Sequence, residues 1–370
     1  MFRGVNLIKS LNLTNFNTKN VKDMSSLFYE CKSLINADFS NFDTSLVTDM
    51  SYMFAETNFK SLDLRSFNTK NVENMMELFQ GMYNLESLDI SSFDTSKVTD
   101  MYSMFDSCYR LKELDITSFR TSSVFDMGSM FRNCYILTSL DLSNFDTSNV
   151  EDMILLFEGD NSLTSLDLSK FVTSKVKDMY GMFYQCRNLT SLNLKKFEVS
   201  NVLDFSYMFG NCNSLTYLDL SNFRPTESNH FEDMFVNCTK LASINFSGFS
   251  TSNAMNMTEM FSGCNNLKEL NLKDFDTKKV KFMNSMFANC HSVTSLDLLS
   301  FQTTNLEDMK NLFYGCSSLT SIDLSNFDTT KVTNMENVFY GCEVLKNLDL
   351  SNFNTKNVLA MSNFCNHVIL

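Results

Sequence analysis

Tryptophan is absent from this 370-residue sequence, which also holds only one proline and ten glycines. With so little Pro and Gly, the turns must be built mostly by Asn, Asp, Ser and Thr, whose side chains bond to the backbone nearby. No stretch approaches the ~20 apolar residues of a membrane-spanning helix. Residues 1–20 also lack a basic region followed by an apolar run, so the sequence predicts neither membrane insertion nor a signal peptide.

Basic residues are scarce as well. The chain has 30 Lys and Arg against 43 Asp and Glu, which gives a formal net charge of −13 and a pI near 4.7. Such a surface repels phosphate backbones, so the composition argues against nucleic-acid binding. It favours a cationic partner, or a soluble surface that binds little.

Catalytic signatures are missing. The three histidines, His230, His291 and His367, have no metal-ligating partner at helical spacing, and no G-x-S-x-G, P-loop or dinucleotide-binding fingerprint occurs. The sequence therefore predicts a non-enzymatic protein with no catalytic residues, no cofactor and no metal site.

What the sequence does have is 36 Phe, 24 Met and a strict repeat. One Phe, in the phrase SNF or a close variant, recurs at intervals of 26 residues, with a single interval of 25 between Phe42 and Phe67. A period of this length is typical of solenoids, which grow by adding coils rather than globular cores. The sequence therefore predicts a single repeat solenoid over residues 1–370. The marker residues are Phe16, Phe42, Phe67, Phe93, Phe119, Phe145, Phe171, Phe197, Phe223, Phe249, Phe275, Phe301, Phe327 and Phe353.

Each repeat divides into two halves with different periodicities. In the first half, L-x-x-L-x-L-x-x-F over residues 137–145, the Leu-x-Leu alternation predicts a short strand. In the second half, apolar residues spaced by +3, +3 and +1 over residues 150–157 lie on one face of a helix. Thr147 or Ser148 is placed to cap the N-terminus of that helix.

These halves predict an α/β solenoid. We expect a right-handed, leucine-rich-repeat-like solenoid of about 14 coils of 26 residues, with a parallel sheet on one face and short helices on the other. The alternative is a β-helix-like solenoid in which the second half of each coil is not helical.

The repeat resembles a known family. L-x-x-L-x-L-x-x-F looks like a leucine-rich repeat with Phe in place of the usual Asn or Cys, and the phrase SLDLSNFDTSxVxDMxxMFxGC resembles the 26-residue repeat of BspA-like bacterial surface proteins. The resemblance covers essentially the whole chain. It implies a surface-exposed or secreted adhesion or interaction protein that binds a host protein, mucin or glycan. The alternative function is a structural spacer or self-assembling cell-surface element without a specific ligand.

Both ends of the sequence fall inside a repeat. Met1-Phe2 has the register of Met53-Phe54, and residues 361–370 break off within the second half of a repeat. Solenoids usually need polar-faced caps, so we expect a fragment whose cap and export signal lie upstream. The alternative is end-to-end self-association through exposed apolar ends.

An acidic column is the main candidate binding feature. The residue between the second and third strand Leu is Asp or Asn in every repeat, and strand alternation places it on the exposed face of the sheet. Stacked carboxylates should raise one another's pKa. The column either binds cationic groups or Ca²⁺, or is a solvated row copied by duplication. Aspartate fills it at Asp38, Asp63, Asp89, Asp115, Asp141, Asp167, Asp219, Asp297, Asp323 and Asp349, and asparagine at Asn12, Asn193, Asn245 and Asn271.

Nine of these aspartates, all except Asp38, are our candidate binding residues together with Tyr217. Serine flanks the column in most repeats, and such uniform rungs suit a repetitive ligand or avidity better than a small-molecule pocket. Tyr217 interrupts the uniformity and is therefore a candidate for specific recognition. Other interruptions are Arg65, Glu113, Lys195, Glu269 and Lys273.

Two further features have competing interpretations. Residues 223–235 hold the only proline, Pro225, and place His230 where Asp is usual, which indicates either a local binding loop or hinge or drift at a tolerant turn. The other feature is a column of ten cysteines, which we interpret as small buried residues rather than as disulfides or metal ligands. They are Cys31, Cys108, Cys134, Cys186, Cys212, Cys238, Cys264, Cys290, Cys316 and Cys342.

Overall fold

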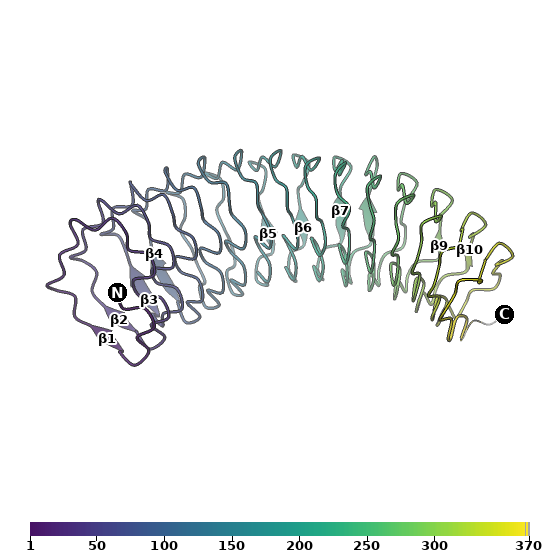
Figure 1. Cartoon of the computed structure of the whole chain (residues 1–370), viewed down its shortest axis with the longest axis horizontal. Coiled ribbons are helices and arrows are strands. Elements are labelled where there is room, and N and C mark those ends of the chain that lie inside the picture. The colour runs from purple at the N-terminus through teal and green to yellow at the C-terminus, as the bar shows by residue number, and fades with distance from the viewer. Residues whose placement is uncertain (367, 369–370) are drawn as a thin grey trace. The chain divides into compact units, whose positions relative to one another are not determined.

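A computed structural model describes residues 1–366 and 368. The chain divides into two compact units, Met1–Lys175 and Val176–Leu370. In each unit every repeat forms one coil, and consecutive coils lie side by side (Figure 1). Over the described residues there is no helix that is long and apolar enough to span a membrane.

The first unit contains five short strands and the second unit contains five more. The pairs β1–β2 and β3–β4 in the first unit, and β7–β8 and β9–β10 in the second, are parallel. The register matches the repeat, since Leu62 pairs with Leu88 and Asp63 with Asp89. The strands are β1 (Ser10–Leu11), β2 (Asn36–Ala37), β3 (Ser61–Asp63), β4 (Ser87–Asp89), β5 (Ser165–Leu166), β6 (Ser191–Leu192), β7 (Tyr217–Asp219), β8 (Ser243–Asn245), β9 (Ser295–Leu296) and β10 (Ser321–Ile322).

The strand predicted from the Leu-x-Leu alternation is confirmed in these coils, although it is only two or three residues long. In β3 the leucine is buried while Ser61 and Asp63 are exposed, as a period of two requires. Two consecutive coils, over residues 111–116 and 137–142, follow the same path without forming a strand. The parallel-strand solenoid is therefore as predicted, with a less continuous sheet.

The predicted number of coils was too high. All fourteen marker phenylalanines lie in the described chain, but Phe16 and Phe353, in the first and last repeats, are only partly buried. The other twelve are buried between neighbouring coils. The solenoid therefore has about 12 turns rather than about 14.

The prediction of short helices was wrong, because no residue of the described chain is helical. In the second half of each coil, backbone N–H groups alternate between two kinds of acceptor. The N–H groups of Met50 and Tyr52 donate to carbonyls of the next coil at 3.0 and 2.9 Å, whereas that of Met53 donates back to Met50 at 3.1 Å. Each coil is thus a staircase of tight turns joined to its neighbours by parallel ladder bonds.

Backbone conformation explains why a helix cannot form there. Two residues four apart in each staircase have positive φ, such as Tyr52 at 58° and Glu56 at 55°. A left-handed residue ends an α-helical run. Apolar side chains at +3 and +4 still reach the core, so the apolar spacing is the same for a helix and for this staircase. The non-helical alternative is the one the structure adopts in this half.

The threonine expected to cap a helix joins two coils instead. The Thr147 hydroxyl donates to the Val172 carbonyl and accepts from the Val172 N–H, both at 2.8 Å. Thr121 makes the same pair of bonds to Asp146. Both threonines are 1% exposed. A small β-branched residue with one donor and one acceptor satisfies both backbone groups of the next coil, which explains why Thr recurs there.

The core is a set of side-chain columns that run from coil to coil. In the second unit, Phe235 and Phe261 stack at 5.5 Å between ring centroids, and Phe287 and Phe313 stack at 5.7 Å. Their rings are parallel to within 2°, and such aromatic contacts add about 0.5–1.5 kcal/mol per pair beyond area burial. The core therefore exists only where coils stack, and one coil alone cannot form it.

Candidate functional site

The acidic column lies on the exposed face of the strands, and each of its candidate carboxylates is held by its own turn. In Asp141, Oδ1 accepts the backbone N–H of Ser143 at 3.0 Å. The same bond, to the residue two positions ahead and at 2.9–3.2 Å, fixes Asp63, Asp89, Asp115, Asp167, Asp219, Asp297, Asp323 and Asp349. Every candidate aspartate therefore has a defined orientation, because its carboxylate closes a turn.

The expectation that stacking would raise these pKa values was wrong for the aspartates that show a shift. Hydrogen bonds from the side chain and backbone of Ser143 lower the pKa of Asp141, and Thr117 lowers that of Asp115 in the same way. Repulsion from Asp141 opposes the shift in Asp115 but is its smallest cause. Donors to the charged form therefore outweigh the neighbouring charges, and these carboxylates are ionised at neutral pH.

In the first unit, Arg65 binds two members of the column. Its guanidinium donates to both carboxylate oxygens of Asp63, at 2.6 Å for the shortest contact, and lies 3.3 Å from an oxygen of Asp89. These bonds lower the pKa of Asp63 to about 2. Asp63 and Arg65, together with Asp38, line an open hollow of ≈ 560 Å³ on the sheet face.

In the second unit, Tyr217 and Asp219 lie on the same face of β7. The Tyr217 side chain is 50% exposed. The Asn245 side-chain amide of β8 donates to Asp219 at 3.0 Å, so an asparagine in the column can hold the neighbouring aspartate. The structure thus brings Tyr217 and Asp219 together. Asp297, Asp323 and Asp349 repeat the position in later coils of the same unit.

Sequence reasoning missed a second acidic column, in the staircase half of the coil. Asp100, Asp126 and Asp152 pair through parallel bridges and are half-buried. Burial raises the pKa of all three carboxyls, and that of Asp126 to about 6. In each, a hydrogen bond from the backbone N–H two residues ahead lowers the pKa but is the weaker effect. The signal in the sequence is the recurrent Asp before Met, as in Asp152-Met153.

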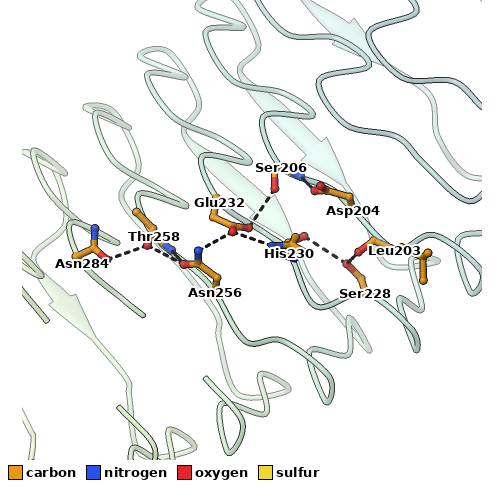
Figure 2. A network of polar contacts seen from close by, with 9 residues as sticks. All are labelled: Leu203, Asp204, Ser206, Ser228, His230, Glu232, Asn256, Thr258 and Asn284. Atoms are coloured by element: carbon orange, nitrogen blue, oxygen red, sulfur yellow. Dashed lines mark hydrogen bonds and ion pairs between the residues drawn. The ribbon is translucent and has the colours of Figure 1, made fainter. Parts of the chain in front are cut away.

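In the second unit this column changes to His230, Asn256 and Phe282 in three consecutive coils. The His230 Nδ1 lies 2.8 Å from Glu232 Oε1, and this contact raises the pKa of His230. The Asn256 amide donates to the same Glu232 oxygen at 2.5 Å. Ser206 donates to the other Glu232 oxygen at 3.1 Å. Three groups from three coils therefore converge on one carboxylate (Figure 2).

The network continues in both directions along the solenoid. Thr258 donates to Asn256 at 2.7 Å and lies 2.8 Å from the Asn284 side-chain oxygen, while Ser228 donates to the Leu203 carbonyl at 3.1 Å (Figure 2). Ser228 replaces the buried valine of other coils. The unusual segment 223–235 is therefore joined to the preceding and following coils by hydrogen bonds, and both Ser228 and His230 have polar partners.

The ten cysteines of the column are buried and free, as the sequence indicated. Thiols of the column donate to Phe carbonyls of the adjoining coil, as Cys264 does to Phe235 and Cys290 to Phe261, both at 3.2 Å. Burial raises the pKa of Cys238 and Cys290 to about 12. Over residues 1–366 and 368, no group of three or more His, Cys, Asp or Glu side chains could hold a metal ion.

The profile of one protein family matches the chain in overlapping segments. Its description is "Mycoplasma protein of unknown function, DUF285", and the segments together span residues 1–368. The matched residues are 1–113, 55–165, 79–188, 157–271, 229–343 and 256–368. No curated protein matches the sequence significantly.

Several solved leucine-rich-repeat structures are similar to this chain. One from Bacteroides ovatus ATCC 8483 is 16% identical, over 93% of this chain and 79% of that one, with a TM-score of 0.43. One from Eubacterium ventriosum ATCC 27560 is 17% identical, over 98% and 83%, with a TM-score of 0.42. A leucine-rich cell surface protein from Faecalibacterium prausnitzii A2-165 is 16% identical, over 92% and 82%, with a TM-score of 0.35.

Proposed function

This chain belongs to that DUF285 family, and we propose that it is a non-enzymatic interaction or adhesion scaffold exposed at the cell surface. Its exposed sheet face binds a host protein, mucin or glycan, and the acidic column pairs with cationic groups where the partner presents them. The residues that carry this binding are the acidic column and Tyr217.

One observation supports the proposal above the others: the carboxylates of the column are both exposed and fixed. Asp141 is held by its turn and has a lowered pKa. Asp323 and Asp349 repeat these properties in the second unit. A carboxylate that is already oriented loses little conformational entropy when a cation arrives. The same oriented charge in successive coils favours a repetitive partner through avidity.

The proposal is tested by removing charge from the column without changing the fold. The triple variant Asp297→Asn, Asp323→Asn and Asp349→Asn is suitable, because Asn193 and Asn271 fill this column naturally and accept the same backbone bond. The probes are immobilised poly-lysine and immobilised mucin. We expect the wild-type chain to bind at least one of them in a salt-dependent manner, and the variant to bind about tenfold more weakly.

A matched control removes the same number of charges elsewhere. Asp94, Asp146 and Asp328 belong to the FDT phrase and also close turns, and Asn68 and Asn354 occupy their column in other coils. The control variant, with Asn at these three positions, should bind like the wild type. Equal loss in both variants would mean that only net charge matters, which would refute the assignment to the sheet face.

The second candidate function is a structural spacer without a specific ligand. The uniformity of the Ser–Asp–Ser rungs favours it, because duplication alone would produce such a surface. Failure of the wild-type chain to bind either probe at low salt would favour the spacer over the scaffold.

A further inference from the structure

We infer that the chain carries a second interaction surface, the His230 patch, formed by the exposed side chains of Leu203, His230, Met255 and Phe282, and that it takes an acidic, apolar segment of a partner protein. The patch belongs to the staircase half of the coils, not to the acidic column of the strands, so it does not depend on the function proposed above.

Backbone contacts place the four side chains together. His230 and Phe282 are both bridged to Asn256, which lies between them. Met255 donates to the Asn229 carbonyl at 3.0 Å, so it lies in the column adjacent to that of His230. Leu203 is joined to the same coil through its carbonyl, which accepts from Ser228. The patch therefore spans four consecutive coils of the second unit.

The patch is apolar where most other coils carry charged or polar residues. Leu203 is 52% exposed, Met255 43% and Phe282 38%. At the column of Leu203 and Met255 other coils carry residues such as Glu307 and Thr333, and only Phe125 and Leu359 are also apolar there. At the column of Phe282 most other coils carry Asp or Asn. Exposed Met and aromatic side chains with few charges are the composition of interface centres. Duplication does not explain the patch, because it departs from the repeated residues at several positions.

The surrounding charges select the partner. Lys177 and Lys281 flank the Leu203–Met255 column, since Leu203 donates to the Lys177 carbonyl and Lys281 donates to that of Met255, both at 2.9 Å. Lys281 also pairs with Glu307 at 3.1 Å. Asp204 and Asp308 lie in the column of His230 and Phe282, so the rim of the patch carries charges of both signs. A partner that presents carboxylates beside apolar side chains can pair with His230 and the two lysines while its apolar side chains cover Leu203, Met255 and Phe282.

The Glu232 network prepares His230 for this contact. Glu232 holds the Nδ1 side of the imidazole at 2.8 Å, and Asn256 and Ser206 hold Glu232. The His230 side chain remains 48% exposed, so the ring can offer Nε2 to an approaching carboxylate. The nearby charges of Glu232 and Asp204 both favour the protonated form of the imidazole.

The test restores the residues that other coils use. The triple variant His230→Asp, Met255→Glu and Phe282→Asp places at each position a residue found in the same column elsewhere, such as Asp204, Glu307 and Asp308. It should therefore fold like the wild type, which circular dichroism and thermal unfolding would verify. The control Phe125→Glu changes an equivalent residue, 49% exposed, in the first unit.

The probe is a phage-displayed library of short random peptides, selected on the wild-type chain in the presence of excess triple variant as competitor. We expect the surviving peptides to combine Asp or Glu with Leu, Phe or Met. Binding of these peptides to the triple variant should be about tenfold weaker or worse, and binding to the Phe125→Glu control should be unchanged.

Three results would overturn the inference: no peptide survives the competition, the survivors are basic or purely polar, or the control loses binding as much as the triple variant. The triple Asn variant of the acidic column serves as a further arm. It should bind the selected peptides like the wild type, so failure of the patch and failure of the sheet-face proposal are distinguishable.

Discussion

At the scale of single residues, Asp160 is a carboxyl group buried in the core with incomplete hydrogen bonding. It stands in the cysteine column, is 0% exposed, and accepts the Cys134 N–H at 2.9 Å. Its other oxygen, Oδ2, has no hydrogen-bond partner. Burial raises the pKa of Asp160 well above its usual value. Folding therefore favours the protonated form of Asp160.

Replacing Asp160 with cysteine, the residue most common in this column, should stabilise the chain at neutral pH by about 1–3 kcal/mol, because an unsatisfied buried group is removed. A raised folded pKa means that stability is lost as pH rises above the unfolded value of about 3.9. The gain of the variant should therefore shrink towards pH 4. Urea unfolding at neutral pH and near pH 4 measures the gain in the free energy of unfolding. A gain that is the same at both pH values would contradict the ionisation argument.

At the scale of the coil, left-handed residues set the path of the staircase. One column of them precedes the cysteine column and is filled by Gly or Asn in most coils, as at Gly315 and Asn211, but by Gln185 in one coil with φ of 60°. The variant Gln185→Gly should raise the free energy of unfolding by about 1 kcal/mol, since a non-glycine residue in this conformation costs about 1–2 kcal/mol.

Two controls accompany that measurement by denaturant unfolding. Gln185→Ala removes the side chain without relieving the backbone and should give no gain. Gly341→Ala should lower the free energy of unfolding, because it places a non-glycine residue at φ of 75°. No steric clash adds to this cost, since the nearest atom to the added Cβ would lie at 3.4 Å. A stable Gly341→Ala variant would show that the conformation is not strained.

The sequence was sufficient for the strand half of the coil and misleading for the other half. The alternation around Leu62 and the register of Asp63 follow from a period of two and a repeat of 26 residues. The staircase was predicted as a helix because both structures bring residues at +3 and +4 to one face. The Gly or Asn before most cysteines of the column, such as Asn211 before Cys212, is the sequence signal for a left-handed turn.

The candidate sites divide in a similar way. The acidic column could be found because every member performs the same local role, so one repeat predicts the rest. The bonds of Glu232 to His230, Asn256 and Ser206 could not, since they depend on side-chain conformations across coils. Sequence reasoning singled out His230 only as a departure from the repeat.

At the scale of the whole molecule, the two acidic columns give stability opposite dependences on pH. Because folding lowers the pKa of Asp141, its carboxylate stabilises the fold at pH values above the pKa of the unfolded chain. This stabilisation is lost as pH falls. The raised pKa of Asp126, about 6, makes stability fall as pH rises from about 4 through 6. We therefore expect maximum stability at mildly acidic pH, measured as the urea midpoint over a pH series.

Paired substitutions separate the two contributions. Asp126→Asn should be more stable than the wild type at pH 8 and similar near pH 4, and Asn74 shows that asparagine can make the same turn bond, to Met76 at 3.0 Å. Asp141→Asn should have the reverse effect, with lower stability at neutral pH and no difference in strong acid. Identical pH profiles for both variants would contradict the opposite pKa shifts.

The buried thiols provide a measure of unfolding along the chain. Cys31 and the nine later members of its column are buried, whereas Cys365 is partly exposed. In the native protein a thiol reagent should modify Cys365 first, and the column only at the rate of opening, because raised pKa values suppress the thiolate. Mass spectrometry after timed labelling measures this order, and rapid labelling of Cys264 in the native state would disprove it.

The Thr147 bonds have a consequence for how such genes change. The hydroxyl of one coil satisfies the backbone of the adjoining coil only, and the cysteine thiols, stacked phenylalanines and ladder bonds act over the same range. Unequal recombination that inserts or deletes 26 codons at a time, within near-identical copies such as DLSNFDT, would therefore leave every surviving contact with an equivalent partner. Length can drift among descendants at almost no energetic cost, while the coils around His230, which bond through unlike side chains, must be inherited as a block.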